Sequence, residues 1–180
     1  MLNKLFAFFF FFIVVGCAQQ QNYHYEVARE PRVEWPVNEY EKLNKTGANI
    51  VSGQGFLKTI GGDVKTCSGN KVFLSPVTSY SKQFVDAIIY KKHGKAPIVL
   101  EPEYPDSRIS LFLKEVTADA DGRFKFYDVP DGMYYLYTMV KWSAATGLQG
   151  SLSQQGGWVI KSITVNSNNR NEYILTGIDE

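Results

Sequence analysis

The chain has 180 residues and carries 19 Lys and Arg against 18 Asp and Glu, a formal net charge of +1. A balance this close to neutral argues against a nucleic-acid-binding protein, which needs a basic surface, and it provides no polybasic membrane patch. The length suits a single domain.

The first sixteen residues have the pattern of an export signal. Lys4 is their only charge, and every residue from Leu5 to Val15 is apolar. A positive residue followed by a short apolar run is typical of a secretory signal peptide, whereas a membrane-spanning helix needs about 20 apolar residues. We therefore predict that residues 1–16 are a signal peptide and that no later segment crosses a membrane.

The segment Val14-Val15-Gly16-Cys17 resembles the lipobox of bacterial lipoproteins. The resemblance implies cleavage before Cys17, a diacylglyceryl group on its thiol and an acyl chain such as palmitate on its new amine. These lipids would anchor the protein stably, since each buried CH₂ contributes about 0.8 kcal/mol. Ala18, rather than Asp, follows Cys17, which by resemblance favours the outer membrane over the inner one. An ordinary signal peptide with a chance cysteine is the alternative.

Residues 17–48 are polar and are predicted to be the lipidated N-terminus and a tether. Asn38–Leu43 has a weak helical pattern. Tyr23, Tyr25 and Trp35 are unusual in a pure linker, so we expect part of the tether to pack on the domain.

Residues 49–180 have the pattern of an all-β domain, with short alternating apolar segments between Gly, Asn, Asp and Pro. Seven strands fit a two-sheet sandwich. They are predicted at Ile50–Thr59, Lys71–Pro76, Arg108–Val116, Arg123–Tyr127, Met133–Trp142, Trp158–Val165 and Glu172–Thr176.

A helical insertion interrupts this pattern. Tyr80, Phe84 and Ile88 recur every four residues and would form one apolar stripe. Ser79 or Ser81 would cap the N-terminus of the helix. The basic run at residues 91–95 would end it, because cations suit a helix C-terminus.

The stretch from Thr117 to Leu136, TADADGRFKFYDVPDGMYYL, resembles the carboxypeptidase regulatory-like domain, a transthyretin- or prealbumin-like sandwich. The resemblance covers about residues 49–176. It implies a seven-stranded Greek-key sandwich that performs no chemistry itself. Asp121-Gly122 is predicted to be a hairpin turn, after which Phe124 and Phe126 enter the core.

No catalytic or metal site is predicted, and the chain is not expected to be an enzyme. Asp119–Gly122 begins like a calcium loop, but the fifth and twelfth positions of that loop would be Arg123 and Pro130, so a turn is favoured. His24 and His93 are too few for a zinc site, which needs three or four ligands.

Cys67 has no predicted disulfide partner once Cys17 is lipidated. It is either a reactive thiol or a small buried side chain, and the absence of a nearby His or basic residue favours burial.

Tyr135 and Tyr137 alternate with the predicted core residues of their strand, so they would form an exposed aromatic stripe together with Trp158. Such a stripe could bind a sugar or a protein. The alternative is that the insertion at residues 80–105 covers it. His93, in the basic run, is a further candidate binding residue.

Residues 78–106 and 143–157 are predicted to be surface loops that make the functional contacts. The sequence favours a membrane-anchored, non-catalytic module that binds an envelope protein or supports envelope structure. The alternative is a lipoprotein that binds peptidoglycan or another glycan through exposed Tyr and Trp. No cofactor besides the lipid is expected.

Overall fold

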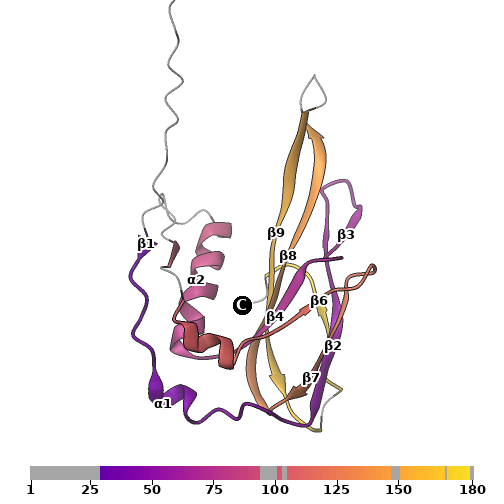
Figure 1. Cartoon of the computed structure of the whole chain (residues 1–180). Coiled ribbons are helices and arrows are strands. Elements are labelled where there is room, and N and C mark those ends of the chain that lie inside the picture. Colours follow the sequence, from indigo (N-terminus) through magenta and orange to yellow (C-terminus); the bar gives the residue numbers. More distant parts are fainter. Residues whose placement is uncertain (1–28, 94–100, 103–104, 147–150, 169, 179–180) are drawn as a thin grey trace, which may run out of the picture.

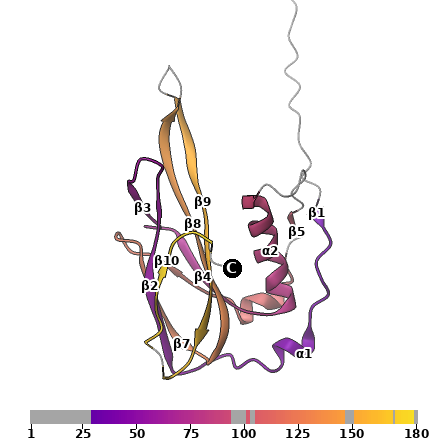
Figure 2. The same ribbon diagram turned by 180° about the vertical axis from the view of Figure 1, so that it is seen from behind.

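The structure is a computed structural model that describes residues 29–93, 101–102, 105–146, 151–168 and 170–178. The predicted signal peptide, Cys17, His24, Tyr23 and Tyr25 lie outside the described residues. Two β-sheets stack face to face, and one helix lies against the outside of one of them (Figures 1 and 2). The prediction of an all-β sandwich with a helical insertion is therefore confirmed.

The first sheet has four antiparallel strands in the order β6-β4-β8-β9. They are β6 (Lys114–Thr117), β4 (Lys71–Pro76), β8 (Gly132–Thr146) and β9 (Ser151–Val165). Strands β8 and β9 form one long hairpin with an unbroken register from Gly132↔Val165 to Thr146↔Ser151.

The second sheet also has four strands, centred on β2. They are β2 (Asn49–Lys58), β3 (Val64–Thr66), β7 (Arg123–Val129) and β10 (Glu172–Leu175). Strands β3 and β7 run antiparallel to β2, whereas β10 runs parallel to it. The two sheets thus contain eight strands, one more than the seven predicted, because the short strand β3 has almost no sequence pattern of its own.

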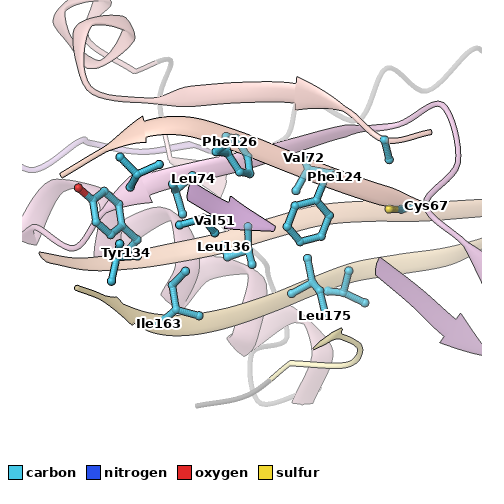
Figure 3. Close-up of a cluster of buried hydrophobic side chains, with 14 of the residues drawn as sticks. Val51, Cys67, Val72, Leu74, Phe124, Phe126, Tyr134, Leu136, Ile163 and Leu175 are labelled. Carbon is cyan, nitrogen blue, oxygen red and sulfur yellow. The ribbon is translucent and has the colours of Figure 1, made fainter. Parts of the chain in front are cut away.

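The main core fills the space between the two sheets (Figure 3). Phe124 and Phe126 enter it from β7, while Leu74 of β4 and Leu136 of β8 enter it from the opposite sheet. Along β7 the two phenylalanines alternate with exposed residues, as the period of two along a strand requires. The core residues predicted from that alternation are therefore confirmed.

The helix α2 (Ser79–His93) covers the outer face of the first sheet (Figures 1 and 2). The remaining elements are β1 (Arg29–Glu30), α1 (Val37–Tyr40), β5 (Glu101–Pro102) and the 3₁₀-helix η1 (Ser107–Leu111). Val85 and Ile88 pack from α2 against Tyr137 and Ile160 of the sheet. This second apolar cluster confirms the predicted helical stripe.

Thr78 caps the N-terminus of α2, where Ser79 or Ser81 was expected. The Ser81 backbone N–H donates to Thr78 Oγ1 at 3.1 Å, and the Thr78 N–H donates to Ser81 Oγ at 2.9 Å. This reciprocal arrangement is that of a capping box, in which two otherwise unpaired N–H groups are satisfied together.

Two predicted segments differ from the structure. Residues 107–111 form η1 instead of a strand, because Asp106 Oδ1 accepts the Arg108 backbone N–H at 2.9 Å and caps a helical turn. Residues 143–157 were expected to be a loop, yet those that the structure describes belong to the β8–β9 hairpin. Backbone hydrogen bonding between β8 and β9 continues through Gly, Ser and Gln residues here, because the register of the two strands is already fixed by the rest of the hairpin.

The turn at Asp121-Gly122 connects the two sheets and does not close a hairpin, since β6 and β7 belong to different sheets. Gly122 has φ +77°, and a Cβ there would lie 2.9 Å from the Gly55 carbonyl oxygen. Glycine is needed at this position both for its backbone angle and for space.

Gly53 allows β10 to approach β2 closely, since a Cβ on it would lie 2.0 Å from the Tyr173 carbonyl oxygen. Gly53→Ala should therefore lower the free energy of unfolding by about 1–3 kcal/mol, the usual range for an overpacked site. Gly157→Ala is the matched control, because no atom lies within 4 Å of a Cβ at that position. Urea denaturation of both variants checks this, and equal effects would contradict it.

Candidate functional site

The predicted aromatic stripe is not exposed, because α2 covers it. Tyr137 is only 8% exposed, and its ring lies 5.6 Å from that of Phe84 on α2. Trp158 contacts the same Phe84 ring edge-on at 5.8 Å, and Tyr135 packs in this cluster too. The open alternative, that the insertion covers these side chains, is therefore correct.

Burial changes the chemistry of Tyr137. Loss of solvent raises the pKa of its phenol to about 12. The phenol is thus held neutral beneath the helix. The other candidate binding residue, His93, ends α2, and its side chain lies outside the described residues.

Cys67 is fully buried in the main core, as the burial interpretation predicted. Its thiol donates to the Gly122 carbonyl oxygen at 3.4 Å, and burial raises its pKa. A thiol that is both buried and protonated is a poor nucleophile. Cys67 therefore acts as a core side chain.

Asp119 organises the turn between β6 and β7. Its Oδ1 accepts the backbone N–H groups of Asp121 at 2.9 Å and Arg123 at 2.8 Å. Within the described part of the chain, no group of three or more His, Cys, Asp or Glu is placed to hold a metal ion. The same residues contain no helix with the length and apolar character of a membrane span.

A segment before the first long strand, residues 31–47, packs across α2 and η1, and we call it the strap. Glu39 fixes it to the start of α2, since its carboxylate accepts both the backbone N–H and the hydroxyl of Ser79, at 2.8 and 2.7 Å. Gln83 of α2 accepts from the Val33 N–H and donates to the Pro31 carbonyl. The expectation that part of the tether packs on the domain is therefore confirmed.

An aromatic cluster holds the middle of the strap. Trp35 stacks on Tyr40 with ring centroids 4.0 Å apart, and it meets the ring of Tyr80 edge-on at 5.1 Å. Phe112, just after η1, packs against Tyr40 at 4.8 Å. Aromatic pairs contribute about 0.5–1.5 kcal/mol each beyond the area they bury. The strap is thus an integral part of the folded structure.

The strap and η1 together form an open groove of about 350 Å³. The Arg108 guanidinium lies 4.8 Å from the Trp35 ring, and that of Arg32 lies 4.6 Å from the Tyr80 ring. The groove is lined by Arg32, Val33, Glu34, Trp35, Val37, Tyr80, Asp106 and Arg108. Two arginines against two carboxylates make it formally neutral, and its aromatic wall is rigid.

Asp106 and Arg108 form a bidentate ion pair in this groove. Arg108 Nη2 donates to Asp106 Oδ2 at 2.6 Å, and Nε donates to Oδ1 at 2.9 Å. These hydrogen bonds hold the pKa of the Asp106 carboxyl at about 2 and raise that of Arg108. The Tyr80 hydroxyl oxygen accepts a hydrogen bond from the Asp106 backbone N–H. The groove therefore presents a fixed pair of planar polar groups beside an apolar wall.

Sequence reasoning missed this groove. Its two sides come from residues 32–37 and 106–108, and the second side was expected to begin a strand. Trp35 was the one available signal, because a tryptophan is out of place in a polar tether.

A second groove of about 680 Å³ is lined by residues of β2, β6, β7 and β10. It is lined mainly by polar strand residues such as Gln54, Lys125 and Glu172. The exposed Tyr127 lies on the same sheet, with the Lys125 ammonium 5.1 Å from its ring.

Neither a protein-family model nor a curated protein matches this chain. Among solved structures, the crystal structure of "a putative carbohydrate binding protein" from Pseudomonas aeruginosa is similar, with a TM-score of 0.67 and 29% sequence identity. The similarity covers 81% of this chain and 99% of the other. Nearly the whole of that protein therefore has a counterpart here.

Cys67 should resist modification in the folded protein, because its thiol is both buried and protonated. At pH 8 we expect a maleimide reagent to label the native full-length protein less than a tenth as fast as the protein in denaturant. The Cys67→Ser variant measures the background labelling of any thiol other than that of Cys67. Rapid labelling of the native protein would refute the assignment of Cys67 to the core.

Glu39 should make the stability depend on pH, since the hydrogen bonds from Ser79 lower the pKa of its carboxyl below 4.5. A lowered folded-state pKa contributes stability above the unfolded value, which is lost as the pH falls through the folded value. We expect the full-length protein to have a higher Tm than Glu39→Gln at pH 7, with the gap closing below pH 4.5. Glu41→Gln, two residues further along the chain and also exposed, is the control and should change little at either pH.

Proposed function

We propose that this protein is a lipid-anchored, non-catalytic module of the bacterial envelope that binds glycan in the groove between the strap and η1. The observation that carries the proposal is the Asp106–Arg108 pair beside Trp35, in a fold similar to that of a protein described as "a putative carbohydrate binding protein". The sequence had placed glycan binding second, after a protein partner.

The chemistry of the groove suits a sugar. Sugar hydroxyls both donate and accept hydrogen bonds, so a carboxylate and a guanidinium side by side can engage two neighbouring hydroxyls at once. The C–H face of a sugar ring is apolar and suits an aromatic wall such as that of Trp35. A volume of about 350 Å³ falls within the range of small-ligand sites, at its lower end. Formal neutrality favours an uncharged glycan.

The anchoring part of the proposal rests on Cys17 and the lipobox-like residues before it. The lipid would hold the domain at the outer membrane, and the tether would place the strap and its groove near the membrane side of the domain. The resemblance to the carboxypeptidase regulatory-like domain, with its Greek-key connections, supports a module without chemistry of its own.

Glycan binding can be tested with the purified full-length protein in mild detergent. Isothermal titration with soluble peptidoglycan fragments and neutral polysaccharide fragments should show saturable binding to at least one of them. Arg108→Gln should weaken it at least about tenfold, equivalent to about 1.4 kcal/mol. Because Arg108 also contacts the Trp35 ring, Glu34→Gln provides a second variant that changes a lining residue of the groove and leaves its aromatic residues in place.

Tyr127→Ala, on the other sheet, is the matched control and should bind as the unaltered protein does. Loss of binding in Tyr127→Ala with full binding in Arg108→Gln would place the site on the other sheet and refute the groove. No binding to any fragment would refute glycan recognition.

A further inference from the structure

The β8–β9 hairpin extends well past the rest of the sandwich (Figures 1 and 2). Strand β4 pairs with β8 only from Tyr134 to Thr138. Beyond that point, β8 and β9 continue as a two-stranded ribbon up to the pair Thr146↔Ser151. A ribbon of two strands is only marginally stable by itself in water, so further pairing would stabilise it.

The outer edge of β9, which faces away from β8, can be identified from the contacts of Ile160. The Ile160 N–H donates to the Gly177 carbonyl at 2.9 Å, and Ile160 forms a parallel bridge with Ile178. Main-chain groups of successive residues point to opposite edges of a strand, so those of every second residue point to the same edge. Since the register with β8 is unbroken, the N–H and C=O groups of Gln154 and Leu152 point to this same outer edge.

No strand in the described part of the chain pairs with the outer edge of β9 in the part of the strand that precedes Ile160. Such edges are usually protected by charged residues or proline, which prevent pairing with another strand. Here the sequence from Trp142 to Ile160 contains neither a charge nor a proline. The edge side chains at Ser153 and Gln154 are small or uncharged, and Leu152 is 72% exposed.

We propose that this edge pairs with the same edge of a second copy of the chain. The two edges run antiparallel, and the two-fold axis that relates them passes at one position within the segment from Leu152 to Gln155. Two identical uncharged edges approach without repulsion, and a two-fold axis lets each satisfy the other's N–H and C=O groups. The proposed pairing ends before Gly156, whose φ of +123° lies outside the usual range of strand residues. The first sheet then continues from one copy into the next.

A single short strand pair buries much less than the 1,200–2,000 Å² of a standard stable interface, so the dimer is weak. It forms where copies are concentrated. This inference does not depend on glycan binding, because the β9 edge and the groove are separate surfaces.

Disulfide mapping of the full-length protein in cells tests the proposal. Single cysteines are placed at Leu152, Ser153, Gln154 and Gln155, and membranes are oxidised with copper phenanthroline before non-reducing electrophoresis. Across a two-fold axis only one position faces its own copy within the 4.4–6.8 Å between Cα atoms that a disulfide requires. We therefore expect a homodimer band with a clear maximum at one position, and none for Lys125→Cys or for the unaltered protein.

A proline substitution at the edge distinguishes strand pairing from crosslinks that form by chance collision. Gln154→Pro removes an outward N–H and should reduce the homodimer band at the best of the other three positions at least fivefold. Because that N–H is not used in the pairing with β8, the Tm should stay within a few degrees. Bands of equal strength at all positions, at Lys125→Cys as well, or no dimer band at any position would overturn the proposal. So would a band containing a different protein.

Discussion

The burial of strand β8 on both faces is the constraint on which the rest of the structure depends. Leu136 and Val140 point into the space between the sheets, while Tyr137 points to the opposite side and is buried beneath α2. Full burial of one large apolar side chain stabilises a fold by about 1.5–3 kcal/mol. A sandwich covers only one face of each sheet, so this strand requires a third layer, and the helical insertion supplies it.

The third layer in turn creates the groove. Once α2 lies on the sheet, Tyr80 and η1 form a shelf at its N-terminal end, and the strap packs on this shelf through Trp35 and Tyr40. Glu39 and the Asp106–Arg108 pair fix the two sides. The groove is therefore assembled from three segments that are distant in sequence, and its shape depends on the docking of each. A single aromatic residue, Trp35, contacts all three.

The sequence predicted what depends on local alternation and missed what depends on distant contacts. Phe124 and Phe126 were placed in the core because every second residue of a strand faces the same way. The same rule predicted wrongly that Tyr135 and Tyr137 are exposed. Tyrosine is found both in contact with solvent and beneath an apolar layer, and alternation along a strand does not reveal whether a third layer covers the sheet. The polar residues beyond Trp142 suggested a loop, although hairpin pairing continues through them. Trp35 was recognised as unusual, but nothing near it indicated Arg108 as its neighbour.

The parallel pairing of β10 with β2 has a consequence for when the fold can be completed. Ser52 pairs with Glu172, and Ile178 bridges to β9, so both sheets use residues that are made more than a hundred positions after β2. Contacts of such sequence separation form slowly, because a long loop must close first. During synthesis, the second sheet stays incomplete until residues 172–178 have emerged. Until then, the edge of β2 that β10 covers stays open.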